Sequence, residues 1–189
     1  MAALAIYVRL VSGLLLVTAF AGQAVKAEES TEDFKQMLVK GSVFWVFNTS
    51  EPGEIACRKD EISNVQEKNV SFARYSRKET TSSENLYGIL FNWDDDDSRG
   101  YDGITIYNSK DELLSEEYLE YLNPSKTCAV VKVMKFGDSK DANKNTWRDL
   151  RVSNAGVVSG APQDCAEQFE NALKVTRKPT RQPYTDQCK

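Results

Sequence analysis

The sequence predicts an all-β fold, an eight-stranded antiparallel up-and-down barrel with a short N-terminal helix and a C-terminal α-helix. Seven or eight short segments with strand-like alternation follow one another between about residues 43 and 152. A single helical pattern comes after them, at residues 165–175. The third observation is an even number of cysteines, typical of two disulfides in an exported chain: Cys57, Cys128, Cys165 and Cys188.

The first 27 residues have the pattern of a secretory signal peptide. Arg9 precedes an apolar run from Leu10 to Ala21, and Val25-Lys26-Ala27 fits a cleavage site. The run is shorter than the roughly 20 residues that a membrane-spanning helix needs, which favours a signal peptide over an anchor. We therefore expect residues 28–189 to form one secreted, extracellular ligand-binding domain.

The first elements after this segment are a helix and three strands. Phe34, Met37 and Leu38 share one helical face, and Ser30 or Thr31 is expected to cap that helix. The β-branched and aromatic residues of the next segment are typical of a buried strand. The expected strands are residues 43–47, 55–59 and 70–77.

The segment Leu86–Trp93 has the clearest strand alternation. One face carries large side chains at a strict period of two, namely Tyr87, Ile89, Phe91 and Trp93. These side chains could line a cavity or pack under the C-terminal helix, because both arrangements give the same alternation.

The second half of the chain completes the set of strands. Residues 113–122 fit a helix or a strand, whereas Cys128–Phe136 is the strongest strand pattern in the chain. Asp164 and Glu167 form a capping box that predicts the start of the C-terminal helix. The other two expected strands are residues 104–107 and 147–152.

Composition excludes most catalytic classes. The chain has no histidine, which removes the commonest general base, the usual catalytic triads and histidine-containing zinc sites. Its net charge of −4 argues against nucleic-acid binding. The acidic run Asp94–Asp97 lacks the terminal glutamate of an EF-hand, so we expect a solvated loop. We expect no enzymatic activity, cofactor or metal, no nucleic-acid or membrane partner, and a monomer.

Two glycosylation sequons strengthen the secreted interpretation. Asn48-Thr49-Ser50 and Asn69-Val70-Ser71 both match the acceptor pattern. Each triplet is weak alone, but both agree with the signal peptide and the cysteines. We therefore expect a glycoprotein with glycans at Asn48 and Asn69.

In the order and spacing of its motifs, the chain resembles the lipocalins of tick saliva, in particular the histamine-binding group. The matching motifs are Asp33-Phe34-Lys35, Phe44-Trp45-Val46, Cys57, the segment Cys128–Val133, Asp149-Leu150, Pro162 before Cys165, and Cys188. The resemblance implies disulfides Cys57–Cys188 and Cys128–Cys165. It also implies sequestration of a small host mediator, such as histamine, serotonin or a lipid-derived signal, in evasion of host defence.

The same resemblance implies a set of ligand-binding residues. Glu117 and Asp149 fall where the family places inward carboxylates, and Tyr107 falls on a pocket aromatic. A carboxylate would neutralise a buried ammonium, and an aromatic face would attract it further. Trp45 and Trp147 are candidates for ligand platforms or for core aromatics.

The chain departs from the amine-binding pattern at three places, one of which is Ala129, next to Cys128, in place of an acid. Ser50-Glu51-Pro52-Gly53 replaces a segment rich in aromatic and acidic residues, and Leu90 replaces a pocket acid. A single biogenic-amine site and a more apolar cavity for an eicosanoid, fatty acid or sterol are both compatible with this. We expect a biogenic amine, histamine or serotonin, with the lipid mediator as the alternative. The alternative from another class is an immune or complement modulator that binds a host protein and has a filled barrel.

Overall fold

The computed structural model describes residues 33–94, 99–137 and 142–188. The expected signal peptide, residues 1–27, lies outside the described residues, as do the two proposed helix caps Ser30 and Thr31. Most of the acidic run, residues 95–97, also lies outside them.

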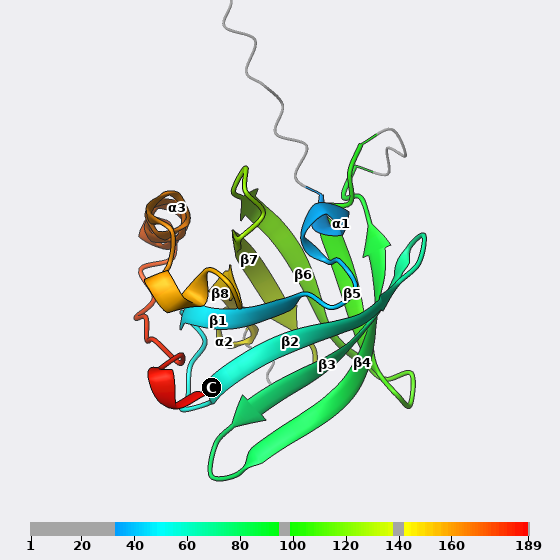
Figure 1. The fold of residues 1–189 in the computed structure, drawn as a ribbon, viewed down its shortest axis with the longest axis horizontal. Coiled ribbons are helices and arrows are strands. Elements are labelled where there is room, and N and C mark those ends of the chain that lie inside the picture. The colour runs from blue at the N-terminus through cyan, green and yellow to red at the C-terminus, as the bar shows by residue number, and fades with distance from the viewer. Residues whose placement is uncertain (1–32, 95–98, 138–141, 189) are drawn as a thin grey trace, which may run out of the picture. The chain divides into compact units, whose positions relative to one another are not determined.

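Eight antiparallel strands close into one barrel (Figure 1), which confirms the predicted fold class. Each strand pairs with its neighbour in sequence, and β1 closes the barrel against β8. Such closure leaves no unpaired sheet edge. The strands are β1 Val43–Thr49, β2 Ala56–Val65, β3 Asn69–Arg77, β4 Thr81–Phe91, β5 Gly103–Asn108, β6 Leu113–Leu122, β7 Cys128–Lys135 and β8 Thr146–Ser153.

Strand β4 is longer than its apolar alternation predicts. Its first part, residues 81–85, is exposed and polar, yet it pairs in unbroken register with the end of β3. Backbone hydrogen bonds hold this part of the hairpin together, although residues 81–85 include no apolar side chain that would predict a strand. The ambiguous segment 113–122 is strand β6, whose alternate side chains Ser115, Glu117 and Leu119 are buried.

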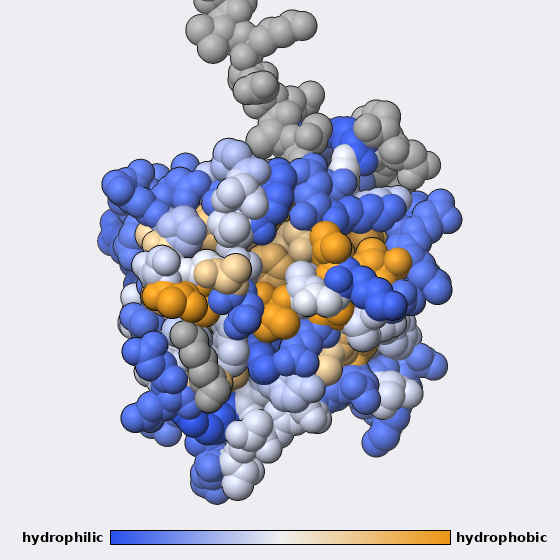
Figure 2. Space-filling view, in the orientation of Figure 1, coloured by the Kyte–Doolittle hydropathy of each residue, from blue (hydrophilic) through white to orange (hydrophobic). Residues whose placement is uncertain are grey.

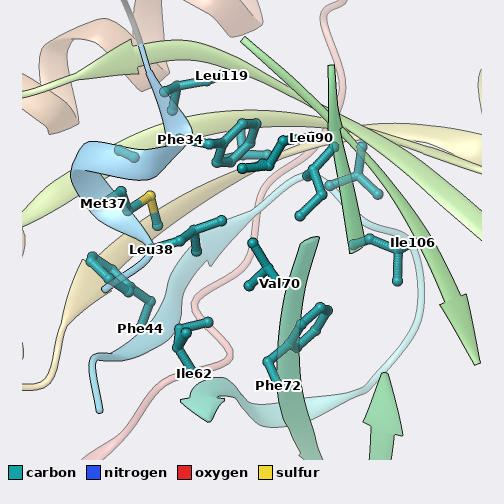
Figure 3. Packing of buried hydrophobic residues seen from close by; sticks show 14 of the residues in the cluster. Phe34, Met37, Leu38, Phe44, Ile62, Val70, Phe72, Leu90, Ile106 and Leu119 are labelled. Carbon is teal, nitrogen blue, oxygen red and sulfur yellow. The ribbon is translucent and has the colours of Figure 1, made fainter. Parts of the chain in front are cut away.

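The one-turn helix α1, Phe34–Met37, lies at one end of the barrel (Figure 1). Its cap is Asp33, whose carboxylate accepts a hydrogen bond from the Lys35 amide at 2.9 Å. Phe34 and Leu38 are buried and reach the innermost cavity of the barrel. Figure 3 shows these side chains packed with aliphatic and aromatic residues of the surrounding strands, among them Val70 and Leu90. Helix α1 therefore closes this end.

The barrel interior is narrow. At β4 the inward side chains are Leu86, Gly88 and Leu90, which are all buried, while the larger side chains of this strand point outward. A Cβ atom at Gly88 would lie 2.4 Å from a methyl carbon of Ile104 on β5. The size of a side chain, as well as its hydropathy, therefore decides which face of this strand turns inward.

Helix α3, Gln163–Lys174, packs outside the barrel on β6, β7 and β8. Its buried residues Cys165, Phe169 and Leu173 contact an outer layer that includes Val130 and Leu150. The predicted capping box does not form, because Pro162 is the cap residue and Asp164 lies within the first turn. The other helices are α2 Ala142–Asn145 and the short 3₁₀ turns Val157–Ser159 and Asp186–Cys188.

Two disulfides attach the C-terminal region to the barrel, with the pairing that the resemblance implies. Cys128–Cys165 joins β7 to α3, and Cys57–Cys188 joins β2 to the end of the tail. The tail also exchanges two backbone hydrogen bonds of 2.9 Å between Arg181 and Thr49. The tail is therefore fixed along β1 and β2 by both covalent and backbone contacts.

The face in Figure 2 is mostly hydrophilic, with hydrophobic residues gathered in its middle. No helix within the described residues combines the length and the apolar character needed to cross a membrane.

The burial of Phe34 in α1 predicts a large stability cost for its removal. Phe34→Ala should lower the free energy of unfolding by about 3–5 kcal/mol, since the ring fills the closed end of the barrel. Val39→Ala is the control, because Val39 lies just beyond the helix and is 57% exposed. Its cost should stay within about 0.5 kcal/mol. Urea denaturation followed by circular dichroism measures both, and equal effects would contradict a closing role for Phe34.

Candidate functional site

Five charged side chains meet in the middle of the barrel, where strand alternation turns them inward. They come from four strands and are buried or nearly so. We call them the central ionic cluster: Asp60 of β2, Arg74 of β3, Glu117 of β6, and Asp149 and Arg151 of β8. A buried charge is costly unless it is paired and hydrogen-bonded. The contacts within the cluster therefore decide what it can bind.

Glu117 lies between the two arginines. Arg151 Nη1 is 2.6 Å from one of its carboxylate oxygens, and Arg74 Nη2 donates to the other at 3.0 Å. Arg74 also forms a two-pronged contact with Asp60, at 2.8 and 2.7 Å. This bidentate geometry is the strongest form of an arginine–carboxylate pair. The carboxylates of Asp60 and Glu117 are thus already neutralised by protein groups.

Opposing effects act on the pKa of Glu117. Burial alone would raise this pKa, but the neighbouring guanidinium groups of Arg151 and Arg74 outweigh burial and lower it to about 2. Glu117 is therefore ionised across the physiological range and is held by two cations.

Asp149 is fully buried and has weaker partners. The hydroxyl of Thr49 donates to it at 2.6 Å, whereas Arg151 Nη2 lies 3.4 Å away. Burial raises the pKa of Asp149, and the attraction of Arg151 and Arg58 only partly opposes that rise. Asp149 is therefore the carboxylate of the cluster with the least stabilised charge.

The cluster separates two spaces inside the barrel. On the α1 side lies a cavity of about 10 Å³, bounded by Phe34, Leu38 and every cluster residue except Asp149. That is the size of a single water molecule. The centre of the barrel is therefore filled by side chains.

On the other side lies the open-end pocket, a hollow of about 310 Å³. Its lining contains both apolar and charged side chains. Arg74 of the central ionic cluster is one of the charged residues, and Glu51 and Glu84 are others. The complete lining is Glu51, Ile55, Arg58, Arg74, Glu84, Leu86, Leu114, Ser115, Val133, Lys135 and Trp147. This volume is within the range of small-molecule pockets.

Two polar groups of the open-end pocket have no partner among the described residues. They are the Ser115 hydroxyl and the indole N–H of Trp147, both buried. Buried polar groups in proteins are nearly always hydrogen-bonded, and leaving one unpaired costs about 1–3 kcal/mol. These two groups are therefore candidates for contacts with a bound molecule.

The structure places three of the five residues proposed from sequence inside the barrel. Glu117 and Asp149 lie in the central ionic cluster, and Trp147 lines the open-end pocket. Asp149 points inward because its neighbour Leu150 packs outward beneath α3.

Tyr107 and Trp45 lie on the outer face of the barrel and so do not belong to this interior site. Tyr107 stacks on Tyr87 with ring centroids 5.2 Å apart. Trp45 packs edge-on against Tyr184 of the tail, at 5.3 Å, and its indole N–H donates to Asn154.

The two expected glycosylation sites differ in exposure. Asn69 is exposed at the start of β3, whereas Asn48 is half-buried in β1. The hydroxyl of Ser50, the third residue of the first sequon, is buried and accepts a hydrogen bond from the Arg148 amide. Both sites stay predictions, and the structure exposes Asn69 more than Asn48.

Sequence reasoning missed the partners of the acidic residues. Neither Arg74 nor Arg151 is among the predicted site residues, although each occupies an inward position in a segment predicted to be a strand. The available signal was the two-residue period of a β-strand. Arg151 stands two residues after Asp149 and must therefore lie on the same face of the strand. Ser115 stands two residues before Glu117 and follows the same rule.

The Glu117 contacts predict a stability loss on mutation and in acid. Glu117→Gln should cost about 3–5 kcal/mol at neutral pH, because it leaves two buried guanidinium groups without their shared carboxylate. The lowered pKa also means that wild-type protein should lose about 3 kcal/mol as pH falls from 4.5 to about 2. The raised pKa of Asp149 acts with the opposite sign and offsets part of this loss. The variant lacks the Glu117 titration, so its stability should vary less in this window.

Glu120→Gln is the matched control for Glu117→Gln. Glu120 is on the same strand and pairs with Arg148 at 2.6 Å, but its side chain is 28% exposed. A surface pair of this kind contributes roughly 0–1 kcal/mol. Urea denaturation at several pH values measures both variants, and a flat wild-type profile in the acid range would contradict the Glu117 assignment.

Comparisons with known proteins give a structural likeness only. No protein-family model and no curated protein matches the sequence. The structure of Japanin from Rhipicephalus appendiculatus bound to cholesterol is similar, with a TM-score of 0.53 at 9% identity over 80% of this chain and 98% of that chain. The siderocalin Ex-FABP, described as having dual ligand specificities, has a TM-score of 0.55 at 10% identity over 77% of this chain and 94% of its own. Together with the strand topology, these neighbours show that the chain has the lipocalin fold.

Proposed function

We propose that this protein captures a small molecule in the open-end pocket and sequesters it without chemical change. The observation that carries the proposal is the pair of buried, unpartnered groups in that pocket, the Ser115 hydroxyl and the Trp147 indole N–H. The hollow of about 310 Å³ is large enough for a small ligand, whereas the centre of the barrel is filled.

The polar groups of the pocket favour a ligand with an oxygen acceptor and an apolar body. An indole N–H can only donate, so its partner must accept. Arg74 also lines the pocket as a donor, and Leu86 and Val133 supply apolar contact. A sterol, fatty acid or eicosanoid has both parts. Its oxygen would face Trp147 and Ser115, and its apolar body would displace water from the wall.

A biogenic amine such as histamine or serotonin is the second candidate. It is supported by Glu117 and Asp149, the two carboxylates inside the barrel. Both already interact with Arg151, at 2.6 and 3.4 Å, so an ammonium group would have to displace that guanidinium. An ammonium group offers no acceptor to Trp147, so the imidazole of histamine or the hydroxyl of serotonin would have to supply it. A sterol, fatty acid or eicosanoid needs no displacement of Arg151.

A protein-binding role is the third candidate, and the filled centre of the barrel supports it. In that role the loops would contact a host immune or complement protein, and the open-end pocket would be incidental. Binding of a small molecule that depends on Trp147 would contradict this version.

We also propose that the protein acts outside the cell. Two disulfides in the described chain support this compartment, because disulfides persist in oxidising environments. Export would follow from the expected signal peptide, and a role in tick saliva would follow from the resemblance described above.

The Trp147 and Ser115 assignments give a test with two readouts. Trp147→Phe keeps the ring but removes the N–H, so affinity for an oxygen-bearing ligand should fall about three- to tenfold. The unliganded protein should be equally or more stable with Ser115→Ala, which removes only an unpaired hydroxyl, whereas Trp147→Phe also shrinks a buried core side chain and should cost stability. Calorimetric titration with oleic acid, cholesterol, histamine and serotonin measures the affinities, and thermal unfolding measures the stability. Ser115→Ala should also weaken binding of an oxygen-bearing ligand, by a similar factor.

Trp45→Phe is the matched control, because it removes an indole N–H outside the barrel. That N–H donates to Asn154 at 3.0 Å, so its loss should lower stability by about 1 kcal/mol and leave binding unchanged. Tight binding of histamine or serotonin with no binding of the two lipids would favour the amine candidate instead. A protein that binds none of the four probes would contradict small-molecule capture in this pocket.

A further inference from the structure

The outer face of β4, β5 and β6, together with the turn after β4, carries five aromatic side chains where a barrel usually presents polar residues to water. They are Tyr87, Phe91, Trp93, Tyr107 and Tyr118. Ile89 and Trp93 on this face are 40% and 68% exposed. Exposed apolar patches on a folded domain commonly mark binding sites. The open-end pocket is inside the barrel, so the proposed function does not use this face.

Three of the rings form an open corner. Phe91 and Tyr118 meet at 85° with centroids 5.7 Å apart, and Trp93 meets Tyr118 at 72° and 5.4 Å. Gly103 makes this arrangement possible, because a Cβ atom there would lie 2.3 Å from the Phe91 ring. The amide of Trp93 donates to Asp102 at 2.8 Å, which fixes the backbone beneath the indole. The three rings are therefore positioned by the fold.

A carboxylate lies within the same corner. Glu116 lines a shallow hollow of about 330 Å³ together with Ile89, Phe91, Trp93, Thr105, Tyr107 and Tyr118. The Tyr118 hydroxyl donates to Glu116 Oε2 at 2.7 Å. Its other oxygen, Oε1, accepts no hydrogen bond from the described residues, so it remains open to a ligand.

The face already holds an ammonium group. Lys132 Nζ of β7 lies 5.5 Å from the centroid of the Tyr118 ring. Cations are attracted to the negative faces of aromatic rings, and cages of nearly perpendicular rings are typical sites for alkylated ammonium groups. Asp102 adds negative charge beside Trp93, whereas Asp94 is paired with Arg99 at 2.5 Å. The rings and the acids therefore attract the same kind of ligand.

We propose that this outer hollow is a second binding site, selective for a small organic cation of the alkylammonium class. Phe91, Trp93 and Tyr118 would surround the cationic group, and Glu116 would supply the opposite charge. The site is separate from the open-end pocket and would be occupied whether or not that pocket holds a ligand.

Choline and its neutral isostere, in which a tert-butyl group replaces the trimethylammonium group, test the proposal on the full disulfide-bonded protein. NMR titration of the tryptophan indole signals should show a saturable shift of Trp93 with choline and a much weaker effect with the neutral alcohol. Phe91→Leu keeps bulk over Gly103 but removes the ring, so it should weaken choline binding about two- to fivefold. Glu116→Gln should weaken it by a similar factor. Lys132→Met removes the competing ammonium and should strengthen binding.

Trp147→Phe separates the two sites, because it alters the open-end pocket and should leave the choline titration unchanged. Equal binding of choline and the neutral alcohol would overturn the proposal, since the face would then recognise apolar shape alone. Loss of the Trp93 shift in Trp147→Phe, or a choline shift of the Trp147 indole that persists in Trp93→Leu, would also overturn it. A protein that self-associates through this face in sedimentation experiments, with no choline response, would assign the patch to a second copy of the chain instead.

Discussion

Arg151 and Glu117 form the ion pair on which the interior of the barrel depends. At 2.6 Å, the pair joins β8 to β6 across the middle of the molecule, and Arg74 extends the contact to β3 and β2. Each of these charges would be costly alone in a closed barrel, so the cluster is stable only as a set. Its side chains fill the space that a central ligand would need. The usable hollow is therefore displaced to the open end.

The local pattern of the chain was sufficient to predict the barrel. Alternation marks most strands, and closure follows from the number of strands and the need to cover sheet edges. The same pattern could not reveal the polar half of β4, where only backbone hydrogen bonds define the strand. It also could not decide between helix and strand for residues 113–122, because glutamate and leucine favour helices locally while pairing with β5 and β7 imposes a strand.

The interior site was only partly predictable, for a different physical reason. Alternation identifies two faces of a strand but does not say which one turns inward. In β4 the aromatic face would be assigned to the core by hydropathy, yet the narrow barrel admits Leu86, Gly88 and Leu90 instead. The partner of Glu117 was equally hidden. Arg74 is 43 residues away in sequence, and only the closed topology brings the two side chains to 3.0 Å.

Closure of one end by α1 has a kinetic consequence. Phe34 and Leu38 fill that end and the ionic cluster fills the middle, so among the described residues the open-end pocket has no route to solvent through the α1 end. A molecule bound there must leave by the path it entered. A second molecule cannot reach the pocket before the first has left, and exchange would proceed at the dissociation rate, whatever the concentration of the competitor. The dissociation rate constant therefore sets how long a bound molecule stays out of solution.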